Sequence, residues 1–178
     1  MSFIPVIENV FYSNGRYWGK RNASLYNRGS VWAMNTGIQS ADLNMVWNEK
    51  PLIPGDHETI ADIKMIYRQS GLPFWWWMFP GGQSQTTMDM LQAEGFSFVD
   101  SIPCMMTDLS LMSDEASDDA AISVIRVSKP EELTLWEEVS FAGFDFPQET
   151  KQQYHRFVKT FNLAADSPQE FFLVFYHG

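Results

Sequence analysis

The spacing of apolar residues predicts the elements of this chain most clearly after its first third. A helix is predicted between Asp56, which suits an N-cap, and Gly71, which suits the C-cap position. Its apolar residues recur on one helical face, as an amphipathic helix requires: they are Ile60, Ile63, Ile66 and Tyr67. A second helix is predicted from Ser84 or Thr86 to Gly95.

Strands are predicted around these helices. The almost wholly aromatic run 74–79 is one, and residues 43–47, 96–102 and 105–109 are three more. The first 55 residues mix scattered Asn and Gly with aromatic residues. We therefore expect short elements there, joined by turns that the aromatic side chains fix to a core.

The C-terminal part has the order strand, helix, helix, strand. Residues 122–127 alternate as a half-buried strand does, and Ser128 to Glu131 fit a capping box that opens the first helix. The second helix is expected over an apolar stripe from Tyr154 to Ala165. The continuous apolar run 171–176 is typical of a strand buried on both faces. His177-Gly178 then resembles the start of a hairpin turn, so we expect this part to be the front of a larger domain.

An acidic segment separates this part from the rest. Residues 113–119 carry four carboxylates and no large apolar side chain, which is typical of a solvated linker. We therefore predict an N-terminal module at 1–112, a linker at 113–120 and a second module at 121–178.

The amino-acid composition limits the classes of partner and the cellular location that we expect. Hydrophobic residues make up 45% of the 178 and aromatic residues 15%, which is enough for a packed core. The net charge of -10 argues against nucleic acid and against anionic membrane surfaces as partners. The sequence shows no membrane span, no secretion signal and only one cysteine, Cys104, so a cytoplasmic location is predicted.

The order of elements resembles the GCN5-related N-acetyltransferase (GNAT) superfamily. The C-terminal module is similar to the opening of that fold. The N-terminal module resembles the partner region of tandem bacterial members through Thr36-Gly37-Ile38, Leu43-Asn44, Pro73 to Trp76 and the run 91–109. The resemblance implies an α/β or α+β fold with a mixed, mostly antiparallel sheet flanked by helices. The first module would then be a degenerate copy.

The resemblance also implies a reaction and a cofactor. The intact protein would transfer acetyl from acetyl-CoA to an amine of a small molecule or a peptide, with a general base taking the amine proton. The family binds the cofactor pyrophosphate on a loop of the form [Gln/Arg]-x-x-Gly-x-[Gly/Ala] at a helix start. No glycine of this chain lies in such a loop, which in the family would follow the final strand. We therefore expect this chain alone to be inactive, and no catalytic residue is named.

Four residues are candidates for substrate binding, each with a structural alternative. Trp76 is placed to line an amine pocket through a cation–π contact, or to pack in the core. Asn44 fits a ligand contact or a turn cap. Phe144 and Phe146 lie in a loop that borders the acceptor groove in the family, or they fill the space between two helices.

Other chemistry has weaker support. His57, His155 and His177 lack metal-ligand spacing, so no metal site is predicted and the first two are expected to be solvated. Cys104 is expected to be a buried structural thiol, although a hydrolase with Cys104 as nucleophile is an alternative. Asp108 is a weak candidate for a general base.

A non-enzymatic function is the main alternative. The degenerate first module would then be a partner surface or a ligand-sensing lid in a binding or regulatory protein. In either case we expect the strand at 171–176 to pair with the N-terminal sheet or with another copy of the chain, because an exposed apolar edge favours aggregation.

Overall fold

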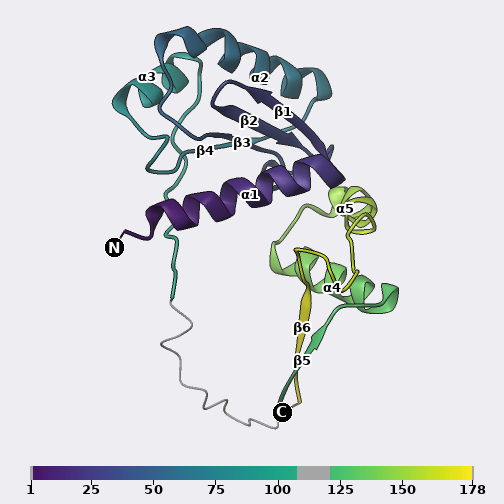
Figure 1. The fold of residues 1–178 in the computed structure, drawn as a ribbon. Helices are drawn as coiled ribbons and strands as arrows, with labels where there is room; N and C mark the ends of the chain where they lie inside the picture. The colour runs from purple at the N-terminus through teal and green to yellow at the C-terminus, as the bar shows by residue number, and fades with distance from the viewer. Residues whose placement is uncertain (1, 108–120, 178) are drawn as a thin grey trace. The chain divides into compact units, whose positions relative to one another are not determined.

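The structure is a computed structural model that describes residues 2–107 and 121–177. The chain divides into two compact units, Met1–Met106 (unit 1) and Thr107–Gly178 (unit 2), which are described separately below (Figure 1). Both mix helices and strands, so the fold class is α+β. The predicted linker lies outside the described residues.

Unit 1 is built on a four-stranded sheet in the order β1-β2-β3-β4. The strands are β1 (Ser24–Arg28), β2 (Val31–Asn35), β3 (Met45–Asn48) and β4 (Trp75–Trp77). The pairs β1–β2 and β2–β3 are antiparallel, whereas β4 runs parallel to β3. A parallel pair needs a crossover connection, and helix α2 (His57–Ser70) lies in it. The sheet is thus mixed and mostly antiparallel, as the sequence predicted.

Helices cover both faces of this sheet (Figure 1). Because successive strand residues point to opposite faces, Val31, Ala33 and Val46 pack against α2 and α3 (Gln85–Ala93). Trp47 belongs to a second cluster with Tyr12 of α1 (Ile4–Asn22) on the other face. The sheet is therefore the middle of three layers.

Helix α1 corrects the expectation of short elements in the first 55 residues. It is 19 residues long, and its Gly15 and Gly19 are buried. A Cβ at Gly15 would lie 2.9 Å from the Trp47 ring, and one at Gly19 would lie 2.6 Å from Leu25. These glycines allow the helix to lie close to the sheet. The predicted helices at 57–70 and 85–93 are confirmed, and Gly71 has the left-handed backbone (φ 66°) of a C-cap.

The strands predicted at 96–102 and 105–109 are wrong over residues 96–107, which contain no strand; residues 108 and 109 lie outside the described part. The segment is apolar yet exposed: Phe98 is 80% accessible and Met105 is 95% accessible. Cys104 is also exposed, so the prediction of a buried thiol is wrong.

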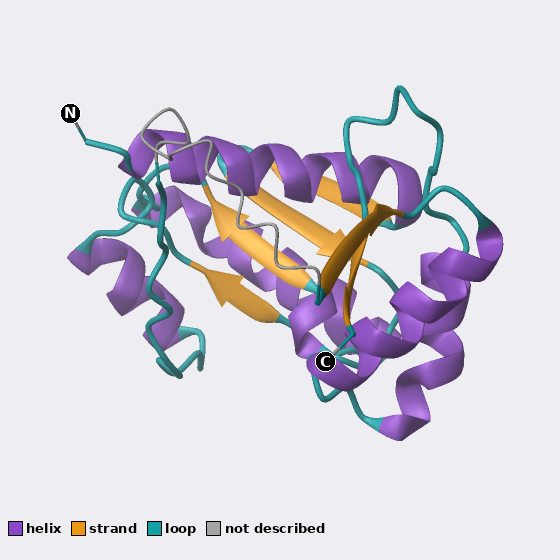
Figure 2. Cartoon of the chain, turned by 90° about the horizontal axis from the view of Figure 1, so that it is seen from below, coloured by secondary structure: helices purple, strands orange, loops and turns teal. Residues whose placement is uncertain are grey.

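The described residues of unit 2 contain two antiparallel strands and two α-helices. The order is β5 (Ile122–Arg126), α4 (Pro130–Gly143), α5 (Lys151–Val158) and β6 (Phe172–Tyr176). The predicted order of strand, helix, helix and strand is confirmed. Strand β6 pairs with β5, in register from Ile122 opposite Tyr176 to Arg126 opposite Phe172 (Figure 2). Within unit 2, β5 and β6 form a two-stranded sheet, and pairing of β6 with the sheet of unit 1 or with another copy stays a prediction.

Two details of unit 2 differ from the sequence prediction. Helix α5 ends at Val158, before the apolar residues further along its expected stripe. Strand β6 is buried on one face only, since Leu173 is 5% exposed but Val174 is 66% exposed. The described part of unit 2 covers one face of this two-stranded sheet and leaves the other apolar and open.

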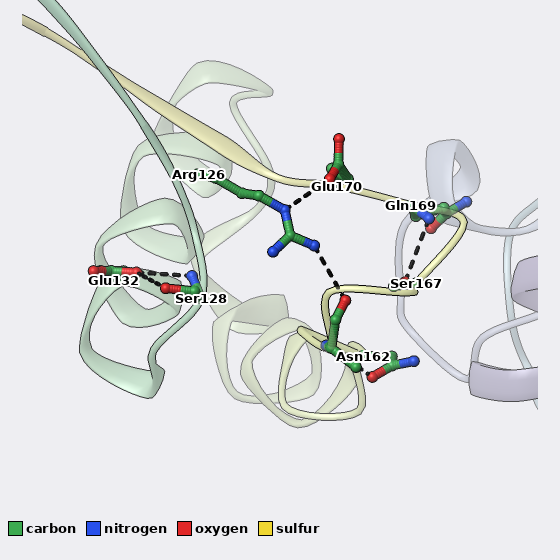
Figure 3. Close-up of polar contacts among 8 residues, drawn as sticks. Arg126, Ser128, Glu132, Asn162, Ser167, Gln169 and Glu170 are labelled. Atoms are coloured by element: carbon green, nitrogen blue, oxygen red, sulfur yellow. Dashed lines mark hydrogen bonds and ion pairs between the residues drawn. The ribbon is translucent and has the colours of Figure 1, made fainter.

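Polar contacts fix the connections of unit 2 (Figure 3). Arg126 at the end of β5 donates from Nε to Glu170 and from Nη2 to the carbonyl of Ala164, over 2.7 and 3.1 Å. The capping box at the start of α4 lies one residue later than predicted. Glu132, not Glu131, accepts from the amides of Ser128 and Lys129. These hydrogen bonds lower the pKa of Glu132, and the bond from the Ser128 amide has the largest effect.

Candidate functional site

Asn44 is one of the four predicted site residues, and in the structure its hydrogen bonds hold separate segments of unit 1 together. Its side chain is fully buried and joins three segments of unit 1. The Oδ1 atom accepts from the amide and hydroxyl of Thr36, at 3.0 and 3.1 Å. The Nδ2 atom donates to the carbonyls of Ile38, Ser40 and Pro73, at 2.7 to 2.9 Å. With these bonds Asn44 holds the turn before β3 against the start of β4.

Trp76 lies partly buried in the core beneath α2 and α3. Its ring meets Phe96 edge to face, with 5.5 Å between centroids. Its Nε1 donates to Oδ1 of Asn48 at 2.9 Å. These contacts correspond to the core alternative for Trp76.

The carboxyl ends of β3 and β4 are where a ligand of a parallel strand pair would sit. This end is closed by a hydrogen-bond network. Asn48 is fully buried, and its Nδ2 donates to the carbonyls of Lys50 and Gly82, at 2.9 and 2.7 Å. Thr87 accepts from the amide of Leu52 at 2.9 Å. A Cβ on Gly82 would collide with the backbone oxygen of Asn48, so the turn is packed against the strand end.

Phe144 and Phe146 follow helix α4 of unit 2. Phe146 is 5% exposed and packs against Phe141 and Tyr154, with centroids 5.9 and 5.2 Å away. Phe144 is 68% exposed and stacks on Phe146 at 5.4 Å. Phe146 therefore fills the space between α4 and α5, while Phe144 presents its ring to solvent.

A cleft of about 440 Å³ is lined by residues of α4 and α5. We call it the α4–α5 cleft. Its lining residues are Glu137, Glu138, Lys151, Gln152, His155 and Arg156. Its volume lies within the usual range for small-molecule sites. None of the four predicted residues lines it.

A His–Glu pair lies within the α4–α5 cleft. Glu137 of α4 is 7% exposed, and both of its carboxylate oxygens lie 2.8 to 2.9 Å from Nδ1 of His155 on α5. A carboxylate fixes the proton on the nitrogen it contacts, which leaves Nε2 with the lone pair in the neutral ring. The His155 side chain is 41% exposed, so it is neither fully solvated, as predicted, nor sealed in the core.

Neighbouring groups hold this pair in place. The hydroxyl of Tyr154 lies 2.9 Å from Oγ of Ser140, which also donates to the backbone carbonyl of Glu137. Burial, together with the charge of Glu137, raises the pKa of Tyr154 despite that hydrogen bond. Tyr154 is therefore neutral at physiological pH and supports the helix pair as a hydrogen-bonding group.

Three charged residues that line the α4–α5 cleft form no ion pair among the described residues. In the described part of the chain, no ion pair involves Glu138, Lys151 or Arg156. The Lys151 ammonium lies 5.9 Å from the centre of the Phe141 ring, at the aromatic end of the cleft. The cleft thus combines a proton acceptor with separate cations and a carboxylate.

Other candidates of the sequence lie apart from this cleft. His57 is 3.8 Å from a Glu94 oxygen at the surface of unit 1, and Asp108 lies outside the described residues. Within residues 2–107 and 121–177, no cluster of three His, Cys, Asp or Glu suits a metal ion. No helix in the same ranges is long and apolar enough to cross a membrane.

Comparisons with known proteins leave the function open. No protein-family model, no curated protein and no solved structure matches this chain. Sequence reasoning missed the α4–α5 cleft because Glu137 and His155 are 18 residues apart on different helices. One signal was present: Glu137 follows Trp136 and precedes Phe141 by four, so it falls on the apolar side of its helix.

Proposed function

We propose that the intact protein is an N-acetyltransferase of GNAT type, which transfers acetyl from acetyl-CoA to an amine. The observation that carries the proposal is the β5-α4-α5-β6 arrangement of unit 2. Its two strands are antiparallel neighbours and both helices lie between them in sequence. This order of elements supports the proposal because it agrees with the opening of the fold that the sequence resembles. The open apolar face of β5 and β6 agrees with a domain that has further layers.

Unit 1 is the degenerate copy in this proposal. The end of β3 does not fit the cofactor, because Asn48 and Gly82 fill the position that a pyrophosphate would need. The loop into α2 also lacks the [Gln/Arg]-x-x-Gly-x-[Gly/Ala] pattern. No step of the transfer is therefore assigned to unit 1.

Unit 2 supplies the acceptor side. His155 lines the α4–α5 cleft and is oriented by Glu137, whose contact with Nδ1 leaves Nε2 as the proton acceptor that a general base needs. The exposed Phe144 lies on the loop that connects the two helices of this cleft. Acetyl-CoA would be held by a loop after β6, which is not among the described residues.

The test is acetyl transfer by the product of the complete reading frame. We expect release of free CoA thiol with a panel of primary amines. The His155→Gln variant should lower kcat by about 100-fold, the usual contribution of a general base, while the KM for acetyl-CoA stays unchanged. The Lys159→Gln variant, outside the cleft, is the control. Absence of thiol release with every amine would refute the proposal.

A second candidate is a non-catalytic binding or regulatory module. The closed end of β3 and β4 favours it for unit 1, and the open face of β5 and β6 offers a surface for a partner or a second copy of the chain. Val174 and Tyr176 of this face are 66% and 75% exposed. A stop codon directly after Gly178, together with a stable dimer in analytical ultracentrifugation, would favour this candidate.

A further inference from the structure

We infer that the α4–α5 cleft binds an amine that also carries a carboxylate or another anionic group. The inference rests on the proposed function for the identity of the reaction, and it adds the class of acceptor. It is carried by the unpaired charges of the cleft and by the His–Glu pair, of which Glu137 is buried and His155 is partly exposed.

The charges of the cleft match a molecule with two opposite ends. Lys151 and Arg156 of α5 are cations without an ion pair among the described residues, and both line the cleft. Glu138 of α4 also lines the cleft, and its carboxylate has no ion pair among the described residues. A cleft of one sign would select a simple anion or a simple cation, whereas this one complements both in a single ligand.

The second cavity, of about 260 Å³ in unit 1, offers a comparison: it is lined by Lys64 and Glu94 among others. These two pair with each other at 3.1 Å, so they satisfy their own charges. Glu138, Lys151 and Arg156 are exposed and have no such partner among the described residues, so a ligand can reach all three.

The His–Glu pair supplies the chemistry at the amine end. Glu137 is nearly buried and takes Nδ1 of His155, so the Nε2 lone pair is the acceptor that remains. The ligand's ammonium N–H bond breaks, its proton moves to Nε2, and the electron pair stays on the amine nitrogen as the nucleophile. Glu137 then stabilises the imidazolium that forms.

The positions of Lys151 and His155 also give the ligand a direction within the cleft. Lys151 is one helical turn before His155, so the two side chains share a face of α5. Lys151 lies against Phe141, at the end where the aromatic side chains pack. The anionic group of the ligand would therefore lie toward Phe141, and the amine would lie toward His155.

Three four-carbon probes test the inference on the 178-residue chain by NMR titration. They are 4-aminobutyrate, which has both charges, and butylamine and butyrate, which have one each. We expect 4-aminobutyrate to shift the amide signals of α4 and α5, with a dissociation constant about tenfold lower than those of the other two. Equal affinities for all three, or no saturable shift in these helices, would overturn the inference.

Variants locate the two ends. Lys151→Gln should weaken 4-aminobutyrate and butyrate but leave butylamine unchanged, and Glu138→Gln should weaken 4-aminobutyrate and butylamine. Lys159→Gln carries the same charge change outside the cleft and should alter none of them. If Lys159→Gln has the same effect as Lys151→Gln, the attraction is a property of net charge, and the assigned site is wrong.

The role of His155 has its own spectroscopic readout. In long-range proton–nitrogen spectra, the neutral ring should carry its hydrogen on Nδ1, and Glu137→Gln should change that preference. A neutral ring protonated on Nε2 in the wild-type chain would overturn the role of His155 as acceptor. These results are independent of acetyl-CoA: a failure of acetyl transfer with intact probe binding would refute the proposed reaction alone.

Discussion

Replacing Asn44 by alanine should destabilise unit 1 more than any exposed polar substitution. The change removes five hydrogen bonds from a fully buried side chain. Two of the bonded carbonyls keep another partner, since Ile38 also accepts from Ser40, and Ser40 also accepts from Leu43. The amide of Thr36 and the carbonyl of Pro73 lose the partner that Asn44 gave them.

The magnitude follows from these two groups. A buried polar group left unsatisfied costs about 1–3 kcal/mol; both of these bonds are part-buried, so we take the low end, about 2 kcal/mol for the pair. Loss of the other three bonds adds about 1–3 kcal/mol, so the free energy of unfolding should fall by about 3–5 kcal/mol. That is a large fraction of the about 5–15 kcal/mol that stabilises an ordinary domain.

The assay is urea unfolding followed by tryptophan fluorescence. It reports on unit 1 because six of the seven tryptophans lie there, namely Trp18, Trp32, Trp47, Trp75, Trp76 and Trp77. With an m-value of about 2 kcal/mol per molar, the midpoint should fall by about 2 M. Asn27→Ala is the matched control: it removes one exposed and one part-buried bond of a turn and should cost less than about 1 kcal/mol. Equal shifts for the two variants would refute the reasoning.

Three further predictions concern packing and charge. Gly82→Ala should cost about 1–3 kcal/mol in the same assay, because its methyl group would press on the backbone oxygen of Asn48. Tyr67→Phe should cost about 1–2 kcal/mol, since the phenol donates to the carbonyl of Met34 at 2.7 Å from a buried position. Glu132 should titrate below the usual range of a glutamate by NMR. Its lowered pKa gives stability above the unfolded pKa, and this stability is lost as the pH falls through the folded pKa, so Glu132→Gln should match the wild type only at low pH. Unchanged midpoints in the first two variants, or a normal glutamate titration, would contradict these accounts.

Local signals predicted the elements whose ends are chemically marked. Helix α2 begins after Asp56 and ends at Gly71, and the capping residue Ser84 accepts from the amide of Thr87 at the start of α3. The order of elements in unit 2 followed from alternation and helical spacing in the same way. Such signals act over a few residues, so they are visible in one sequence.

Tertiary packing decided the elements that were missed. Gly15 was interpreted as a turn residue, yet it lies within α1 because Trp47 needs the space that a side chain would fill. Sequence alternation identified the apolar run 96–102 as a strand, but pairing depends on a neighbour that the described residues do not supply there. Helix α5 ends early, where Thr160 turns its hydroxyl onto the carbonyl of Phe157.

The candidate site likewise contains residues that local sequence signals predicted and residues that only tertiary packing brings together. The aromatic loop after α4 was recognised from Phe144 and Phe146, because exposed aromatic loops often bind ligands. The pair of Glu137 and His155 was not recognised, since its members come together only when α4 and α5 pack. Asn44 was recognised as unusual, and its five hydrogen bonds now give the structural reason.

Acetyl-CoA binding measured by calorimetry tests the central proposal most directly. The titration compares the 178-residue chain with the product of the complete reading frame. The account predicts no binding to the chain of 178 residues, because its strand ends and helix starts offer no pyrophosphate loop, and saturable binding to the product that contains one. Tight binding to the 178-residue chain, or no binding to either protein, would contradict it.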